Sequence, residues 1–261
     1  MNDERRADEP RVAGRVIFVG AGPGAADLIT LRGLHALQQA DVVLHDALID
    51  LALRRHAPQA QWIPVGKRGY CASAAQTEIN AQLLRHAARG AVVVRLKGGD
   101  PSVFGRLEEE LEALHAAGIT TEVVPGVTAA LAAAAGTQRP LTRRGSGRSV
   151  ALSTAVTRDG ELAAGRRADT EVFYMAGRKL TELSRRLLAA GWPADTPVLV
   201  VSRALWPDQI ASEHTVASLP SASVLHAGRP AVVTVGVGAG AVGGMPLRAD
   251  RPQAAPRSIG P

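Results

Sequence analysis

The stretch VIFVGAGPG, residues 16–24, constrains the fold more than any other part of the sequence. Its first four residues are β-branched or aromatic, as is typical of a strand buried inside a parallel sheet. A tight glycine turn follows, and residues 26–40 then carry leucines at steps of three residues, close to the period of a helix with one apolar face. A strand, a glycine turn and a helix in this order predict the opening unit of an α/β fold.

The alternation of strands and helices continues in two series. Strands are predicted over residues 16–19, 42–44, 91–96 and 121–124, and then over 150–153, 170–174, 196–202 and 231–235. Helices with charged outer faces are predicted over residues 78–88, 106–117 and 179–190. The alternation in the first series is typical of a parallel sheet covered by helices.

A polar segment rich in Gly, Ser and Arg, residues 140–149, separates the two series. We therefore expect two consecutive α/β domains, the first of residues 15–140 and the second of residues 141–241. The ends of the chain, residues 1–14 and 242–261, lack an apolar periodicity and are expected to be disordered tails.

The charge balance limits the classes of partner. The chain carries 30 Lys and Arg against 24 Asp and Glu, a net charge of +6, and only three of the cations are Lys. The arginines are dispersed, and three Phe, three Trp and two Tyr are few for stacking on bases, so nucleic acid is not expected as a partner. An acidic small molecule suits this balance, because guanidinium groups bind anions well.

Membranes, disulfides and metal ions are also not expected. No apolar run approaches the roughly 20 residues of a membrane span, and the charged N-terminus lacks the apolar segment of a signal peptide. These features predict a cytoplasmic protein. The single cysteine, Cys71, excludes an intramolecular disulfide and a cysteine-rich metal site.

The glycines of the opening turn allow a second interpretation, a dinucleotide site in a nicotinamide-dependent oxidoreductase. The fingerprint GxGxxG uses its three glycines for the turn, for the pyrophosphate and for helix packing. Here Gly24 comes one residue too early for the third position, and Pro23 lacks the backbone N–H that a phosphate would use. The oxidoreductase stays open as an alternative.

A second glycine cluster lies in VVVRLKGGDPSVFGR, residues 92–106. A predicted strand delivers Gly98, Gly99 and Asp100 at its carboxyl end, where open α/β sheets bind ligands. Two adjacent glycines let a ligand lie against bare backbone, and the carboxylate can accept hydrogen bonds from ribose hydroxyls or an ammonium group. A plain strand-to-helix turn is the alternative for this motif alone.

The motifs GAGPG, LHDALI, VGKRG, QTEIN, RLKGGDPSVFGR, VVPGVTAA, PLT and FYMAG occur in this order. Over about residues 15–240 the chain therefore resembles the tetrapyrrole C-methyltransferases, and within them the branch that acts on uroporphyrinogen III. The resemblance implies two α/β domains with an active-site cleft between them, a homodimer, and S-adenosylmethionine as the methyl donor. It also implies methylation of uroporphyrinogen III at C2 and C7 to precorrin-2, for sirohaem, cobalamin or haem d1.

The resemblance assigns roles to individual residues. Contacts to the donor are implied for Pro23, Gly98, Gly99, Asp100, Val103, Thr128, Ala129, Met175 and Ala204. Asp46 in LHDALI matches the proposed proton acceptor and Lys67 in VGKRG the proposed proton donor. A helix N-cap is the alternative for Asp46, and a surface ion pair is the alternative for Lys67.

Because the family's substrate carries several carboxylates, substrate contacts are expected from arginines. The candidates are Arg68, Arg106, Arg143, Arg144 and Arg148.

The departures from the family pattern concern the substrate more than the donor. Ala47 stands where the family has Arg, Ala72 where it has His, Gly145 where it has Asp, and Val156 where it has His. The chain also lacks the glycine pair that the family has after FGR. Two further alternatives therefore stay open: a methyltransferase for another tetrapyrrole, and a weakly active tetrapyrrole-binding paralogue.

Overall fold

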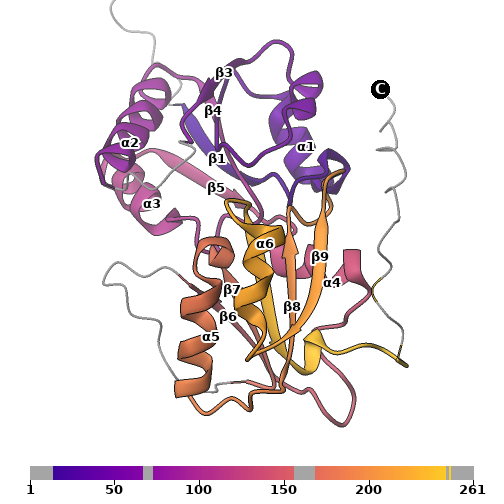
Figure 1. Cartoon of the computed structure of the whole chain (residues 1–261). Coiled ribbons are helices and arrows are strands. Elements are labelled where there is room, and N and C mark those ends of the chain that lie inside the picture. The colour runs from indigo at the N-terminus through magenta and orange to yellow at the C-terminus, as the bar shows by residue number, and fades with distance from the viewer. Residues whose placement is uncertain (1–13, 67–72, 156–167, 245–246, 248–261) are drawn as a thin grey trace, which may run out of the picture. The chain divides into compact units, whose positions relative to one another are not determined.

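The computed structural model of the chain describes residues 14–66, 73–155, 168–244 and 247 (Figure 1). The chain divides into two compact units, of which the first ends at Gly126 and the second begins at Val127. The short segment Pro23–Asp27 groups with the second unit. Residues 127–140 also group with the second unit, although the sequence pattern assigned them to the first domain. Most of the two expected tails lies outside the described residues.

The first unit is built on a five-stranded sheet in the order β3-β2-β4-β1-β5. The strands are β1 (Arg15–Gly20), β2 (Val42–His45), β3 (Gln61–Pro64), β4 (Val92–Lys97) and β5 (Thr120–Val124). Every pairing is parallel, which confirms the expected parallel sheet. All the connecting loops that follow these strands therefore leave the same edge of the sheet.

The helices of the first unit cover both faces of its sheet. They are α1 (Leu31–Gln38), α2 (Ser73–Ala87) and α3 (Leu107–Ala116), with the 3-10 helix η2 (Leu51–His56). Helix α1 lies on one face, and α2 and α3 lie on the other (Figure 1). Helices α2 and α3 pack together, and Leu83 and Leu114 join Phe18 and Leu44 in one core cluster. The helix predicted over residues 26–40 is interrupted: a 3-10 turn, η1 (Ala26–Leu28), comes first, and Thr30 then caps α1 by accepting a hydrogen bond from the Gly33 amide.

The second unit contains a five-stranded mixed sheet in the order β6-β7-β10-β8-β9. The strands are β6 (Val150–Thr154), β7 (Thr170–Tyr174), β8 (Pro197–Ser202), β9 (Ile210–Thr215) and β10 (Ala231–Gly236). Strands β6 and β7 are parallel, and the other pairings are antiparallel. Because β7 and β8 both run antiparallel to β10, the loops that follow β7 and β8 leave the same edge of this sheet.

Three α-helices and three 3-10 helices complete the second unit among the described residues. They are α4 (Ala129–Thr137), α5 (Leu180–Ala189), α6 (Ser223–His226), η3 (Ala176–Arg178), η4 (Leu219–Ala222) and η5 (Val237–Ala239). Helix α5 buries Leu180, Leu183 and Leu187 in one core cluster with Phe173 and Val233. Both units are thus α/β, and among the described helices none is long and apolar enough to cross a membrane.

Candidate functional site

The glycines of the opening turn allow three loops of the first unit to meet at the carboxyl edge of its sheet. The Gly99 amide donates to the Gly22 carbonyl at 2.7 Å, and the Gly22 amide donates in return at 3.3 Å. A Cβ on Gly20 would lie 2.6 Å from the Gly126 Cα, and one on Gly126 would lie 2.3 Å from the Gly99 carbonyl oxygen. Close backbone packing therefore requires these glycines, with no need for a phosphate.

Asp100 fastens the loop after β4 to the loop after β5. Its Oδ2 accepts a hydrogen bond from the Gly126 amide at 2.8 Å, and its Oδ1 accepts one from the Ser102 amide at 2.8 Å. Gly99 beside it has a φ of +73°, in the region that favours glycine. The KGGDP motif is therefore hydrogen-bonded to the loop after β5, and each Asp100 carboxylate oxygen keeps a lone pair for a further donor.

In the second unit, Trp206 joins the end of the opening turn to the loop after β8. Its Nε1 donates to the Pro23 carbonyl oxygen at 3.0 Å. A Cβ on Gly24 would lie 1.6 Å from that same Nε1, so the indole occupies the space that a side chain would need. Ala204, two residues before Trp206, is buried. The structure thus brings two residues expected to contact the donor, Pro23 and Ala204, into one loop cluster of this unit.

Tyr174 joins the FYM and PGVTAA motifs within the same unit. Its hydroxyl lies 2.8 Å from the Thr128 hydroxyl and accepts a hydrogen bond from the Ala130 amide at 3.2 Å. The next residue, Met175, is 41% exposed, so it does not fill the core. Its φ of 57° turns the chain sharply after β7. The remaining donor residues of this unit, Thr128, Ala129 and Met175, therefore lie on two adjoining segments.

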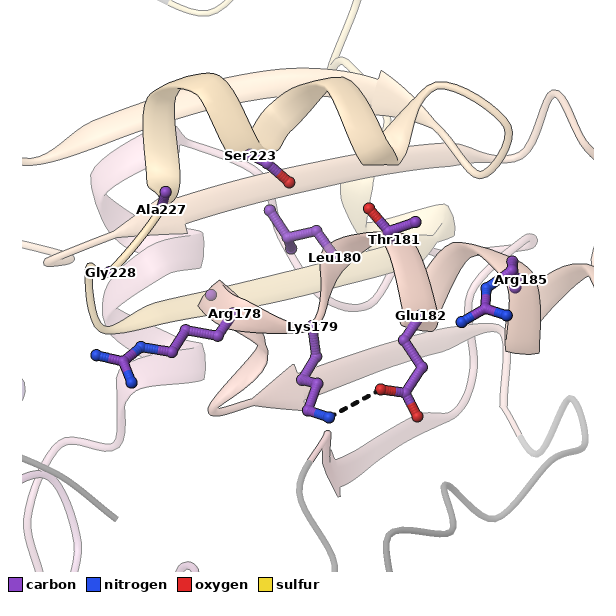
Figure 2. A pocket seen from close by; sticks show the side chains of 10 residues that line it. Arg178, Lys179, Leu180, Thr181, Glu182, Arg185, Ser223, Ala227 and Gly228 are labelled. Atoms are coloured by element: carbon purple, nitrogen blue, oxygen red, sulfur yellow. Dashed lines mark hydrogen bonds and ion pairs between the residues drawn. The ribbon is translucent and has the colours of Figure 1, made fainter.

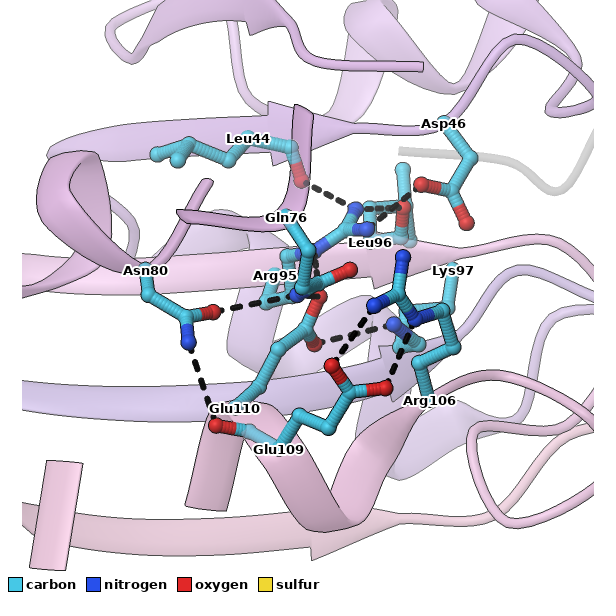
Figure 3. A network of polar contacts seen from close by, with 10 residues as sticks. All are labelled: Leu44, Asp46, Gln76, Asn80, Arg95, Leu96, Lys97, Arg106, Glu109 and Glu110. Carbon is cyan, nitrogen blue, oxygen red and sulfur yellow. Dashed lines mark hydrogen bonds and ion pairs between the residues drawn. The ribbon is translucent and has the colours of Figure 1, made fainter. Parts of the chain in front are cut away.

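Asp46, the predicted proton acceptor, directly follows β2 and takes part in a network of charged side chains (Figure 3). Its Oδ1 accepts a hydrogen bond from Nη2 of Arg95 at 2.6 Å. The Asp46 side chain is 31% exposed, whereas that of Arg95, on the central strand β4, is 3% exposed. Asp50, and not Asp46, caps the 3-10 helix η2, so the N-cap alternative for Asp46 is not observed.

Glu110 of α3 forms the buried centre of this network, with no exposed surface. Its Oε1 accepts hydrogen bonds from Arg95 Nε at 3.2 Å and Gln76 Nε2 at 3.1 Å, and its Oε2 accepts one from Lys97 Nζ at 2.9 Å. Gln76 also donates to Asn80 at 3.0 Å, so the QTEIN motif completes the network. Two carboxylates and two cations balance one another in charge.

The pKa values of the two cations, Lys97 and Arg95, shift in opposite directions in this network. Burial is the largest influence on the Lys97 ammonium and, with the nearby Arg95 charge, lowers its pKa; Glu110 and Asp46 offset only part of this. Burial acts on Arg95 in the same direction, but the charges of Asp46 and Glu110 and their hydrogen bonds together raise its pKa. Arg95 is thus a cation in this network, as guanidinium groups in proteins are.

Comparison with known proteins places this architecture in a family. A family model for tetrapyrrole (corrin/porphyrin) methylases matches residues 15–220. The chain belongs to the tetrapyrrole methylases. A uroporphyrinogen-III C-methyltransferase from Pseudomonas aeruginosa is 46% identical over 202 residues, which cover 76% of this methylase and 82% of the relative. A siroheme synthase from Gluconacetobacter diazotrophicus is 45% identical over 87% of this methylase and 50% of the relative, so the chain spans about half the length of that protein.

Solved structures confirm the expected family and the two-domain α/β fold of the methylase. A uroporphyrin-III C-methyltransferase from Thermus thermophilus, complexed with S-adenyl homocysteine, matches with a TM-score of 0.76 and 37% identity. That match covers 86% of this chain and 98% of the other. A cobalt precorrin-4 methyltransferase matches with a TM-score of 0.77 and 30% identity, over 87% of this chain and 96% of the other.

Several predicted residues of the methylase cannot be placed, because they lie outside the described residues. They are Lys67, Arg68, Cys71, Ala72 and Val156. Within the ranges that are described, no group of three or more His, Cys, Asp or Glu side chains is arranged to hold a metal ion.

The described substrate arginines of the methylase differ in their surroundings. Arg106 is exposed and pairs through two nitrogens with Glu109, at 2.7 and 2.6 Å; the hydrogen bond to Glu109 is the main reason that its pKa is raised. Arg143 donates from both terminal nitrogens to the backbone carbonyls of Gly240 and Ala241, so its guanidinium anchors its own loop. Arg144 is exposed on that loop, as is Arg148.

An open pocket of about 450 Å³ lies at the start of α5 (Figure 2). Its lining includes Arg178, Lys179 and Arg185, but also Glu182, whose Oε2 lies 2.9 Å from the Lys179 ammonium. None of the residues predicted to bind the donor or the substrate lines it.

Four residues of the contacts described above were given no role by the sequence pattern. They are Arg95, Glu110, Tyr174 and Trp206.

Proposed function

We propose that this methylase transfers methyl groups from S-adenosylmethionine to C2 and C7 of uroporphyrinogen III and so forms precorrin-2, a precursor of sirohaem, cobalamin or haem d1. The observation that carries the proposal is the 46% identity, over most of both chains, to a uroporphyrinogen-III C-methyltransferase. The Thermus protein complexed with S-adenyl homocysteine supports the donor, because that molecule is what remains of S-adenosylmethionine after methyl transfer. A homodimer in the cytoplasm stays a prediction from the sequence.

The proposed donor contacts lie on loops, except for Ala129, which begins helix α4. In the first unit they are Gly98, Gly99, Asp100 and Val103, and in the second unit Pro23, Thr128, Ala129, Met175 and Ala204. Bare backbone at the glycine pair suits a flat nucleoside, and the Asp100 carboxylate can accept hydrogen bonds from ribose hydroxyls. Met175 offers an exposed apolar surface. The donor has no phosphate, so Pro23 can supply shape without a backbone N–H.

The proposed chemistry is an in-line displacement. The pyrrole carbon attacks the methyl group, the bond from carbon to sulfur breaks, and the sulfonium becomes the neutral thioether of S-adenosylhomocysteine. Orientation of the two reactants supplies much of the rate in such a step. A proton must then leave the tetrapyrrole to restore its conjugation, and we assign Asp46 as its acceptor and Lys67 as the proton donor. No covalent intermediate with the protein is needed.

The proposed substrate contacts are Arg68, Arg106, Arg143 and Arg144, because guanidinium groups bind carboxylates well. Both terminal nitrogens of Arg143 donate to backbone carbonyls, so its contribution would include holding the loop that carries Arg144. A tetrapyrrole other than uroporphyrinogen III is the second candidate. The observation that favours it is the group of departures at Ala47, Ala72, Gly145 and Val156. The similarity to a cobalt precorrin-4 methyltransferase is consistent with this alternative.

Anaerobic incubation with S-adenosylmethionine and uroporphyrinogen III, followed by mass spectrometry, tests the proposal. We expect a product heavier by two methylene units, and a gain of one unit would limit the activity to a single methylation. Methylation of another tetrapyrrole alone would favour the second candidate. A folded protein that binds S-adenosylhomocysteine but methylates neither would be the weakly active paralogue. Binding of NADH without binding of S-adenosylhomocysteine, measured by calorimetry, would favour the oxidoreductase.

A further inference from the structure

Asp46 is the only carboxylate of the charged network that reaches solvent. The side chains of Arg95 and Lys97 are each 3% exposed, Glu110 is fully buried, and Asp46 is 31% exposed. The network therefore runs from the interior of the first unit to one accessible carboxylate at the carboxyl edge of the sheet. Figure 3 shows the Asp46 carboxylate directed toward the Arg95 guanidinium, while Glu110 approaches Arg95 from α3.

Arg95 is fixed from several directions at once. Its Nε donates to Glu110, and its Nη1 lies within hydrogen-bond distance of the Leu44 and Leu96 carbonyl oxygens, at 3.5 and 3.3 Å. The remaining nitrogen, Nη2, donates to Oδ1 of Asp46 at 2.6 Å. The guanidinium is planar and its donors point in fixed directions, so Asp46 is held at a defined place.

The position of Arg95 in the sheet is costly for stability. Arg95 lies on the central strand β4, opposite Phe18 of β1 and Leu44 of β2, both of which are buried. A well-packed apolar residue stabilises such a site at least as well as a buried ion pair, because desolvation of the charges offsets most of their attraction. Stability alone therefore gives no reason for a cation here.

We propose that Arg95 is a positioning residue for the proton acceptor: it holds Oδ1 of Asp46 and leaves Oδ2 to take the proton from the substrate. Among the described residues, Oδ1 is the only carboxylate oxygen of Asp46 with a hydrogen-bond partner. Glu110 accepts a hydrogen bond from Nε of Arg95 and so fixes the guanidinium on the side away from Asp46. The Lys97 ammonium forms an ion pair with Glu110 and neutralises its buried charge. This inference rests on the proposed function, in which Asp46 accepts the proton.

The test is a double-mutant cycle on the methylation reaction with Arg95→Lys and Asp46→Asn. Lysine keeps the charge but cannot bond to Glu110, Asp46 and two carbonyls together. We expect kcat to fall about tenfold to a hundredfold for Arg95→Lys, with the dissociation constant of S-adenosylhomocysteine unchanged. In the Asp46→Asn background the same substitution should cause no further loss of kcat, because Arg95 acts through Asp46.

Arg139→Lys is the matched control. Arg139 is 2% exposed and pairs with Glu213, which is 44% exposed, so this pair also joins a buried guanidinium to an accessible carboxylate. It belongs to the second unit and shares no partner with Asp46. We expect Arg139→Lys to lower the melting temperature as Arg95→Lys does, while kcat stays at the wild-type value.

A second variant, Glu110→Asp, keeps all four charges of the network but shortens the carboxylate side chain that holds Arg95 by one methylene. It replaces Arg95→Lys in the test if Arg95→Lys does not fold. We expect a smaller loss of kcat that is also absent in the Asp46→Asn background. The inference would be overturned, with the proposed function intact, if either single variant kept the wild-type kcat. It would also be overturned if the loss of kcat were equal in the wild-type and Asp46→Asn backgrounds. A wild-type protein that methylates no tetrapyrrole would overturn the proposed function, and the inference with it.

Discussion

Gly126 shows at the scale of one residue why the glycines near the donor loops are required. Its substitution by Ala would place a Cβ 2.3 Å from the Gly99 carbonyl oxygen, which is a backbone atom and not the end of a flexible side chain, so the backbone would have to shift. We expect Gly126→Ala to weaken binding of S-adenosylhomocysteine by at least about tenfold, because displacement of the KGGDP loop misplaces the donor contacts. Calorimetric titration measures this.

Gly118→Ala is the control for Gly126→Ala. Gly118 has a φ of +69°, but no atom lies within 4 Å of a Cβ there. This substitution should cost about 1 kcal/mol of stability through backbone strain and leave donor affinity at the wild-type value. Equal effects of both substitutions on affinity would contradict the role assigned to Gly126.

His226 makes the stability of the second unit depend on pH. Its ring is fully buried between Ser202 and Ser212, and burial, with the nearby His214 and Arg229, lowers its pKa to about 4. An unfolded His takes up a proton near pH 6.5, so the contribution of His226 to stability is present above that pH and is lost as the pH falls from 6.5 to 4. The full loss is about 3 kcal/mol.

Urea denaturation at pH 7 and pH 4.5 of wild type and His226→Gln checks this contribution. Glutamine cannot take up a proton, so the variant should lose less stability between the two pH values than wild type does. The difference between the two proteins is the informative quantity, because carboxylates titrate in both. Equal losses in both proteins would show that His226 does not contribute.

The contacts of single residues explain which part of the site could be predicted. KGGDP was recognisable because adjacent glycines in a loop after a strand form a local pattern, whereas PGVTAA was identified through the family resemblance. The hydrogen-bond partner of Asp46 could not be recognised in the same way. Arg95 lies 49 residues away on another strand, and Glu110 lies a further 15 residues along the chain on a helix. Nothing in a strand of apolar residues with one Arg indicates which carboxylate that Arg will face.

At the scale of elements, Trp206 fastens the segment Pro23–Asp27 to the second unit. Its Nε1 bonds to the Pro23 carbonyl, and the Arg203 guanidinium stacks on the indole, 4.1 Å from its centroid. Trp206→Phe replaces the indole by a smaller phenyl ring and removes the N–H, which leaves the Pro23 carbonyl oxygen without this donor at a cost of about 1 kcal/mol, apart from the packing lost with the smaller ring. We expect a roughly fivefold loss of affinity for S-adenosylhomocysteine, measured by calorimetry.

The matched control is Trp62→Phe in the first unit. Trp62 Nε1 also donates to a backbone carbonyl, that of Ala57, at 3.0 Å. The bond lost is of the same kind, so the fall in melting temperature should be similar, but neither residue is a proposed donor contact. A loss of donor affinity as large as that of Trp206→Phe would assign the effect to general destabilisation.

The elements that the sequence pattern missed have a common cause. Strands β3, QWIP, and β9, IASEHT, lie at sheet edges and are only partly buried, so they lack the continuous apolar run of the central strands. Helix α4 consists largely of Ala and has no polar face, which removes the period that identifies a surface helix. The sequence pattern predicted the central strands of both sheets and the edge strands β5 and β6, but it missed the edge strands β3 and β9.

At the scale of the whole molecule, the net charge of +6 and the predominance of Arg suit an anionic substrate. Interactions between exposed charges weaken as salt shortens the Debye length from roughly 10 Å at 0.1 M to 3 Å at 1 M. We therefore expect the KM for uroporphyrinogen III to rise several-fold between these two salt concentrations. Steady-state methylation measures it.

The dissociation constant of S-adenosylhomocysteine is the internal reference for this salt effect. The proposed donor contacts are backbone, uncharged side chains and one carboxylate, and S-adenosylhomocysteine carries no net charge at neutral pH, so its affinity should change less than about twofold over the same range. The exposed Arg106 and Arg144 account for the difference between the two ligands. If salt weakened the binding of both ligands by the same factor, exposed arginines would not account for substrate binding. The affinity for the substrate would then come from buried contacts, which salt screens much less.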